Sequence, residues 1–327
     1  MAEMTMVEAI NATLHAEMTR DERVIVFGED VGHNGGVFRA TDGLQSSFGD
    51  RRVVDTPLAE AGIIGTAVGL AAAGLVPVPE IQFLGFLYQA MHQLAGQVTR
   101  LRYRSNGRFE APITIRSPFG GGVRTPELHS DDLAAQFANV PGLKVVLPSS
   151  AADAKGLLAT AIRDPDPVLF LEPLRGYRAV RGEVPDGEHL VPFGQLRRVR
   201  EGDDLVIVTW SYMVEVSRRA ADALAEDGYS VGVVDLRTLV PLDVAGLAAA
   251  VGATGRVVVV EEAPLTSGFA GEVIATVIEE CFYDLEAPPQ RVCGYDVPYP
   301  VGMLEDRYIP TVERIAATCR RTLEARP

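Results

Sequence analysis

Short apolar segments rich in β-branched residues alternate with segments of helical periodicity, and this alternation constrains the fold more than any other feature. In the first half of the chain it predicts strands at 24–29, 52–55, 76–83, 112–117, 143–148 and 167–172. The helices predicted between them are 62–75, 85–106 and 151–163. Nearly continuous apolar strands separated by helices are typical of a parallel sheet covered on both faces, so we expect an α/β fold.

A change in composition divides the chain into two parts. Residues 173–203 are rich in Pro, Gly and charge and have little periodicity, so we interpret them as a surface linker. A second series of strands and helices follows, with strands at 204–210, 230–236, 256–262 and 290–296 and helices at 212–227, 243–251, 269–282 and 310–325. We therefore predict two domains, residues 1–185 and 186–327, each a mostly parallel sheet with helices on both faces.

Composition narrows the possible functions. The 44 acidic and 30 basic residues give a net charge of −14, which argues against nucleic acid or anionic membranes as partners and favours a basic protein surface. No run approaches the roughly 18 uninterrupted apolar residues of a membrane span. The N-terminus lacks the apolar core of a signal segment, and the three cysteines have no metal-ligand spacing. We expect a cytoplasmic protein with free thiols.

Polar and aromatic residues follow three predicted strands and a long loop of the first domain. Glu29 ends the first strand in GEDVG, Glu60 follows the second in DTPLAEAG, and Gln82 and Phe86 follow the third in EIQFLGF. His129 lies in the glycine-rich loop SPFGGGVRTPELHSDD. Open parallel sheets bind ligands at the carboxyl ends of their strands, so this joint placement indicates one shared pocket.

Each of these residues also has a simpler interpretation. Glu60 can cap the helix at 62–75, and Glu29 can be an ordinary loop acid. Gln82 and Phe86 can belong to the core or to a helix surface, and a single loop histidine is more often structural. The glycine run can cradle a phosphate, but it lacks the GK[ST] of a P-loop. The residues alone leave these alternatives open.

A series of longer motifs runs through the chain: GEDVG, DTPLAEAGIIGTAVGLA, EIQF, TIRSPFGGG, HSDD, PGLKVVLPSSAADAKGLL, DLRTLVPLD and GRVVVVEEA. In these motifs, and over essentially its whole length, the chain resembles the beta subunits of the thiamine-diphosphate-dependent decarboxylase (first) component of 2-oxoacid dehydrogenase complexes. The resemblance implies a pyrimidine-binding domain of thiamine-diphosphate enzymes followed by a transketolase C-terminal-like domain.

The resemblance gives two residues catalytic roles. Glu60 matches the acid that hydrogen-bonds N1′ of the cofactor's aminopyrimidine, which helps the cofactor to become its ylid. Because burial raises a carboxyl pKa, an apolar environment favours a proton shared between Glu60 and N1′. His129 matches the histidine that transfers protons and steers the 2-oxoacid and the incoming lipoyl group.

The resemblance also implies the remaining contacts. The expected cofactor-binding residues are Glu29, Leu58, Ala59, Glu60, Gln82 and Phe86. The expected substrate contacts are Phe83, Phe86 and His129. Glu29 matches an acid linked to communication between active sites. Many relatives have Asp at the position of His92, which puts the local hydrogen bonding of that helix in doubt but leaves the cofactor contacts unaffected.

A potassium site is a further implication, because family members often hold this ion through backbone carbonyls and an acid. The matching residues are Ile113, Ala161, Ile162, Asp164 and Asp166. Oxygen-only ligation suits a hard cation. The alternative interpretation of the segment AIRDPDP is an Asp-Pro turn that ends a helix.

One expected motif is missing. Thiamine-diphosphate enzymes usually bind the diphosphate through a divalent ion held by a GDG segment and a later Asn, and neither FGDRR nor EGDDL opens such a segment. We therefore expect this chain to supply the pyrimidine half of a site and an alpha subunit to supply the diphosphate and magnesium half, in an α2β2 heterotetramer. The small-residue segment 65–74 fits close helix contact between subunits, with internal packing as the alternative.

The implied reaction is oxidative decarboxylation of a 2-oxoacid with acyl transfer to lipoyl groups of a dihydrolipoyl acyltransferase core, bound through its peripheral-subunit-binding module. The C-terminal segment from EEAPLTSG onward resembles branched-chain members most, so we expect a branched-chain 2-oxoacid. A pyruvate or acetoin dehydrogenase is the alternative. A non-catalytic docking subunit and an autonomous transketolase-like enzyme are alternatives of other classes. Intact Glu60 and His129 argue against the first, and the missing diphosphate motif argues against the second.

Overall fold

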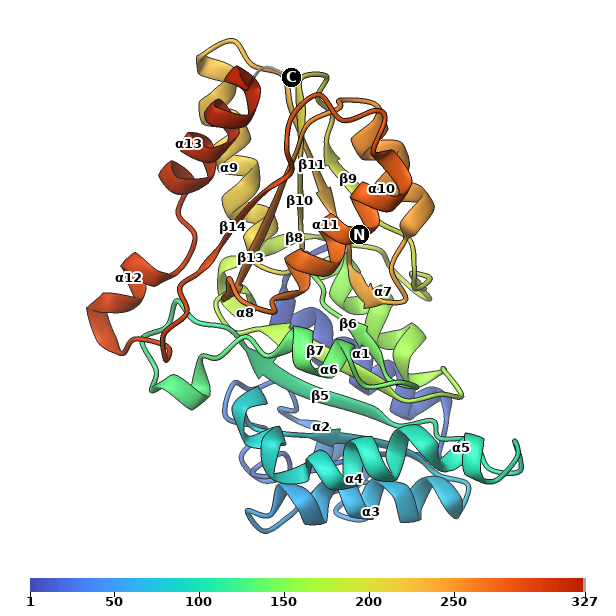
Figure 1. The fold of residues 1–327 in the computed structure, drawn as a ribbon. Helices are drawn as coiled ribbons and strands as arrows, with labels where there is room; N and C mark the ends of the chain where they lie inside the picture. Colours follow the sequence, from blue (N-terminus) through green and yellow to red (C-terminus); the bar gives the residue numbers. More distant parts are fainter. Residues whose placement is uncertain (326–327) are drawn as a thin grey trace.

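The computed structural model describes residues 1–325, which form two α/β units with separate central sheets (Figure 1). The larger sheet has seven strands in the order β12-β6-β7-β5-β4-β2-β3, and the smaller has five in the order β14-β13-β10-β11-β9. Helices cover the sheets, so the predicted α/β class with two sheet-based domains is confirmed.

Six strands of the larger sheet run parallel, and all six were predicted. They are β2 (Val24–Gly28), β3 (Val53–Asp55), β4 (Val76–Glu80), β5 (Thr114–Phe119), β6 (Lys144–Val146) and β7 (Val168–Pro173). Every residue of β4, β5 and β7 is buried. Burial on both faces explains why these segments show no alternation of apolar and polar residues.

Helices pack on both faces of the larger sheet. One face is covered by α1 (Met6–Arg20) and α7 (Ala151–Ile162), and the other by α3 (Glu60–Ala72) and α4 (Met91–Gly96). The continuous helix predicted at 85–106 is wrong. That region is divided into η1 (Leu84–Ala90), α4, η2 (Val98–Arg100) and α5 (Leu101–Arg104). Gly96 is the last residue of α4, where it weakens the helix.

The linker predicted at 173–203 contains regular structure, which corrects that interpretation. It includes α8 (Gly176–Ala179), β8 (Arg181–Val184) and β9 (Arg197–Arg200). Strand β8 pairs with β1 (Ala2–Thr5), and β9 joins the smaller sheet antiparallel to β11. These short strands depend on partners that are distant in the sequence, so local composition could not reveal them.

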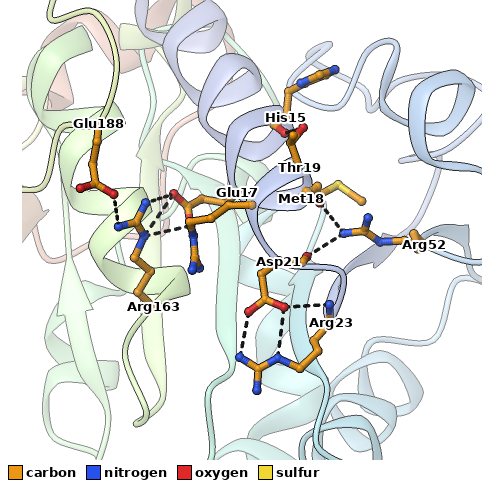
Figure 2. A network of polar contacts seen from close by, with 10 residues as sticks. His15, Glu17, Met18, Thr19, Asp21, Arg23, Arg52, Arg163 and Glu188 are labelled. Carbon is orange, nitrogen blue, oxygen red and sulfur yellow. Dashed lines mark hydrogen bonds and ion pairs between the residues drawn. The ribbon is translucent and has the colours of Figure 1, made fainter.

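A polar network ties α1 to its neighbours (Figure 2). Glu17, on α1, is buried and accepts a hydrogen bond from Nη2 of Arg163 at 2.7 Å. The other side of the Arg163 guanidinium pairs with the exposed Glu188. Arg52 donates to the main-chain oxygen of Met18 at 2.8 Å, in the last turn of α1, where carbonyls lack helical partners. The network fixes the end of α1 against α7 and β3.

The second unit follows the predicted order of strands and helices. Its parallel strands are β10 (Leu205–Thr209), β11 (Val231–Asp235), β13 (Val257–Pro264) and β14 (Gln290–Gly294). Its main helices are α9 (Met213–Glu226), α10 (Val244–Gly252), α11 (Phe269–Cys281) and α13 (Val312–Glu324). Among residues 1–325, no helix combines the length and the apolar character needed to cross a membrane.

One strand links the two units. β12 (Thr238–Val240) lies in the second half of the sequence but pairs antiparallel with β6, at the edge of the larger sheet. Beside it, Arg237 forms an ion pair with the buried Asp153 of α7 at 2.7 Å. The larger sheet therefore includes a strand from beyond residue 186. The domain boundary between residues 185 and 186 stays a prediction.

Candidate active site at the strand ends of the larger sheet

The carboxyl ends of β4, β2 and β3 lie next to one another and place two acids together. Glu29 directly follows β2, and Glu60 begins α3 shortly after β3. Glu29 is 7% exposed and Glu60 is 2% exposed. Burial raises the pKa of Glu29, and the charge of Glu60 raises that pKa further. The two buried carboxyl groups are therefore close enough for the charge of one to affect the other.

Several buried polar side-chain atoms at this edge have no hydrogen-bond partner within the described chain, and three of them belong to titratable residues. These three are Oε1 of Glu29, Oε2 of Glu60 and Nδ1 of His129. A buried polar atom without a partner costs free energy, so such atoms point to a ligand. Helix α3 has no side-chain cap at its N-terminus, so the alternative that Glu60 only caps this helix is not supported.

His129 lies among aromatic side chains. It ends the short helix η3 (Glu127–His129), and its ring centroid is 4.4 Å from that of Phe83 and 5.1 Å from that of Phe86. Phe38 packs edge-on against Phe83 with ring centroids 5.6 Å apart. The aromatic rings restrict the imidazole and leave its Nδ1 atom unpaired. The structure thus joins the loop histidine to the segment that follows β4.

The position of His129 depends on Gly85, a residue that we did not predict from the sequence to be important. A Cβ atom at Gly85 would overlap the main-chain oxygen of Leu128. Because Gly85 has no side chain, the loop can lie directly on η1, which brings His129 onto Phe83 and Phe86. A glycine between aromatic residues in QFLGF was the available signal, and so was Phe38 in GGVFRAT.

A buried ion network supports the strand ends. Arg116 of β5 is fully buried and contacts Glu80 of β4 at 2.8 Å and Glu172 of β7 at 2.7 and 3.0 Å. The Tyr177 hydroxyl donates to Glu172 at 2.5 Å. Burial raises the pKa of Glu80, although the Arg116 charge opposes this rise. Each of these three strands contains one of the charged residues, and this was the signal in the sequence that we missed.

The remaining expected contacts lie at the rim of the site. Leu58 is 75% exposed, Ala59 is also exposed, and Gln82 is half-buried after β4. Other apolar side chains exposed on the segments that build the site are Val37, Tyr88, Val123 and Leu128. His92 is exposed on α4. The site therefore has a buried floor and an apolar rim that the described residues leave uncovered.

The expected potassium ligands lie at the other edge of the sheet, where strands β5 and β7 begin. They are Ile113, Ala161, Ile162, Asp164 and Asp166. Lys144 Nζ lies 2.7 Å from both carboxylate oxygens of Asp164, and Arg102 contacts Asp166 at 2.9 Å. Among residues 1–325, no group of three or more His, Cys, Asp or Glu side chains could hold a metal ion. A cation here would rely on main-chain oxygens, and it stays a prediction.

Comparisons with known families match both units of the chain. Residues 2–179 match the family described as transketolase, pyrimidine binding domain. Residues 194–315 match the family described as transketolase, C-terminal domain. Together the two matches include every strand of both sheets.

Curated relatives align over nearly the whole chain. The pyruvate dehydrogenase E1 component subunit beta of Bacillus subtilis (strain 168) is 52% identical over 324 residues, which cover 99% of this chain and 100% of that protein. The proteins of the same description from Staphylococcus epidermidis and Staphylococcus aureus are each 51% identical, with the same coverage.

Solved structures share the fold. A chain described as a split gene transketolase, inactive beta4 tetramer, has a TM-score of 0.81 at 22% identity, and the match covers 99% of each chain. A transketolase mutant from Pichia stipitis has a TM-score of 0.70 at 17% identity, covering 99% of this chain and 46% of the other. At these identities the similarity concerns the fold alone.

Proposed function

The chain belongs to the family of E1 beta subunits of 2-oxoacid dehydrogenases, and from this premise we propose that it builds the pyrimidine half of a thiamine-diphosphate site in a pyruvate dehydrogenase. One observation carries the proposal. The carboxylates of Glu29 and Glu60 are buried, and each has an oxygen without a partner, at the same sheet edge as the aromatic cluster around His129. The chain thus provides the buried side of a binding site, and we infer that another subunit provides the opposite side.

The residues of this edge fit the aminopyrimidine of thiamine diphosphate. Oε2 of Glu60 is a buried acceptor for a ring nitrogen, Phe86 offers an aromatic surface, and the half-buried Gln82 offers a polar contact. The bound cofactor would supply the nucleophilic carbon that attacks the 2-oxoacid. Because Glu60 is excluded from water, solvent would not compete with a ring nitrogen for a hydrogen bond at Oε2.

His129 is the proposed second catalytic residue. Its imidazole is held edge-on by Phe83 and Phe86, and its unpaired Nδ1 can accept or donate a proton at the substrate. A hydrogen-bonding or cationic imidazole also suits an anionic 2-oxoacid and the acyl group passed to a lipoyl arm. Phe83 and Phe86 form the apolar side of the same substrate space.

The subunit that completes the site is proposed to be an alpha subunit, which would also hold the diphosphate and magnesium. The exposed small-residue face of α3 supports this assembly. A Cβ atom at Gly69 would meet nothing within 4 Å, and one at Gly65 would meet only Gln93, at 3.8 Å. Internal packing therefore does not require these glycines, whereas close contact with another subunit does. The expected arrangement is α2β2.

Pyruvate is the proposed substrate. The relatives at 51–52% identity are described as pyruvate dehydrogenase subunits, which favours the alternative over the branched-chain 2-oxoacid that we expected. The acyl product would pass to a dihydrolipoyl acyltransferase core, whose basic binding module suits a chain of net charge −14. The buried, unpaired Glu60 argues against a non-catalytic docking subunit. The cytoplasmic location stays a prediction from the sequence.

Reconstitution tests the proposal. The chain is co-expressed with the product of a neighbouring gene that carries a GDG segment and a later Asn, and turnover of pyruvate and 3-methyl-2-oxobutanoate is compared. We expect higher kcat/KM for pyruvate, and neither tight cofactor binding nor turnover by the chain alone. A preference for 3-methyl-2-oxobutanoate would restore the branched-chain assignment. Robust turnover by the isolated chain would exclude the two-chain site.

A further inference from the structure

The loop that carries His129 is held by two acids of the C-terminal unit. Glu262 of β13 accepts a hydrogen bond from the main-chain N–H of Gly121. Glu305, the first residue of α12 (Glu305–Tyr308), accepts from the N–H of Gly122 at 3.1 Å and from that of Arg124 at 3.0 Å. Figure 1 shows α12 beside the loop that follows β5. Three hydrogen bonds thus join the loop main chain to the second domain.

The two acids are themselves fixed. Glu305 is 1% exposed and Glu262 is 9% exposed, so neither can easily turn to solvent. The Tyr299 hydroxyl donates to Oε2 of Glu305 at 3.0 Å, which orients that carboxylate. A Cβ atom at Gly121 would overlap Tyr299, so only glycine permits this close approach. A charged acceptor makes stronger hydrogen bonds to N–H groups than a neutral one.

The other end of the same loop rests on the first domain. Leu128 lies on Gly85, and the hydroxyl groups of Thr125 and Ser130 form a hydrogen bond of 2.6 Å across the turn. The Nδ1 atom of His129 has no hydrogen-bond partner in the described chain, so hydrogen bonds to that atom do not fix the ring. The position of the imidazole therefore depends on its contacts with Phe83 and Phe86 and on where the loop main chain is held.

We propose that Glu262 and Glu305 are positioning residues for His129: from the C-terminal domain they hold the main chain of residues 121–124, and so place the imidazole over the strand ends. The inference rests on the proposed function, because His129 is assigned there to proton and acyl transfer. It gives the second domain a part in the active site of its own chain. Displacement of a catalytic group by about 1 Å can cost about 100-fold in rate.

Hydrogen exchange of the full-length chain tests the hold directly. In Glu305→Ala, we expect the amides of Gly122 and Arg124 to exchange about tenfold faster or more, as loss of a charge-assisted hydrogen bond would give. The matched control is Asp306→Ala, which removes only an exposed ion pair with the Arg124 side chain at 3.1 Å. Exchange over 120–128 in this control should match the wild type. Unchanged exchange in Glu305→Ala would overturn the proposal.

Activity of the assembled complex tests the consequence. Glu305→Ala should lower kcat for lipoyl acylation by about tenfold to 100-fold and leave the cofactor Kd unchanged, because Glu60 and Phe86 lie on other elements. Glu305→Gln keeps one acceptor oxygen and should recover part of the rate. Equal loss of rate and of cofactor affinity would indicate general damage and overturn the positioning role.

The two proposals can fail separately. An inactive wild-type complex with the expected exchange pattern would refute the proposed function and leave the contact between loop and acids intact. An active complex in which Glu305→Ala exchanges and acylates like the wild type would refute the positioning role alone. If Glu305→Ala does not fold, as circular dichroism would show, Glu305→Gln carries the same test: several-fold faster exchange supports the proposal, and wild-type exchange with wild-type acylation overturns it.

Discussion

At the residue scale, the proposed role of Glu60 rests on a carboxylate that is buried and has one oxygen without a partner. Burying such a group without a hydrogen bond is unfavourable in the isolated chain. A ring nitrogen that bound at this oxygen would supply the missing hydrogen bond and remove the cost.

Glu60→Gln tests this role. The amide keeps the size of the side chain but cannot release or share a carboxyl proton, so we expect exchange of the cofactor C2 proton in the assembled complex to slow by about 10²–10⁴-fold. The measurement is quenched-flow exchange in deuterated water followed by NMR. Glu110→Gln, at an exposed position, is the matched control. Near-normal exchange in Glu60→Gln would count against the proton role.

Glu261 gives a prediction about pH. Burial, with a smaller contribution from the charge of Asp132, raises its pKa from an ordinary value of 4.5 to about 8. An acid whose folded-state pKa is raised contributes stability that is complete below pH 4.5 and is lost as the pH rises through about 8. Glu261→Gln should therefore flatten the decline of the free energy of unfolding over this window, as measured by urea denaturation of the full chain.

The matched control for Glu261 is Glu279→Gln, which changes an exposed carboxyl group of α11. It should leave the slope of stability against pH as it is in the wild type. An equal slope in Glu261→Gln and in the wild type would show that the buried carboxyl group does not control this dependence.

The sequence supported part of the site at this scale. Glu29, Glu60 and His129 were found because residues at the ends of parallel strands meet at one edge. The ion pairs of Arg116 were missed, because its partners lie on other strands and are distant in the sequence. Gly85 was missed for the same reason: the atom that excludes a side chain there belongs to a distant loop.

At the scale of elements, the sequence was reliable for buried strands and long helices and unreliable for short strands that pair at a distance. All six parallel strands of the larger sheet lie in predominantly apolar segments, which can be recognised without knowledge of the partner strand. Strands β8 and β9 lie in a polar segment, and only β1 and β11 make them strands. The helix predicted at 85–106 is divided, and α4 ends at Gly96, a residue that weakens helices.

Arg163→Ala tests how α1 is held to α7. Glu17 is 3% exposed and would lose its main cationic partner, so we expect the free energy of unfolding to fall by about 2 kcal/mol, which is less than for a fully buried pair because Arg163 is partly exposed. Thermal denaturation measures the change. Glu188→Gln removes only the exposed side of the network and should change stability by about 0.5 kcal/mol or less. Equal effects of the two variants would contradict this account.

At the scale of the whole molecule, exposed apolar residues and small residues mark where we expect a partner subunit to bind. Exposed apolar side chains surround the site. On the outer face of α3, a Cβ atom at Gly69 would meet no other atom within 4 Å. A monomer rarely retains such surfaces unless a partner covers them.

Gly69→Leu tests this surface. A side chain at position 69 enters open space in the single chain, so we expect unchanged or slightly higher stability of the isolated chain. Association with the alpha subunit should be weakened or lost, because the bulky side chain prevents close helix contact; analytical ultracentrifugation of the co-purified chains measures it. Ala225→Leu, at an exposed position of α9, is the control and should assemble normally. Normal assembly of Gly69→Leu would place the interface elsewhere.

The position of β12 has a consequence for how the protein can be divided. The strand Thr238–Val240 completes the larger sheet although it belongs to the second half of the sequence. The N-terminal half expressed alone would therefore expose the unpaired edge of β6. Unpaired edges recruit other strands, so such a fragment would tend to aggregate. The two halves of the gene are therefore not interchangeable modules, and chimaeras between relatives should exchange β12 together with the sheet that it closes.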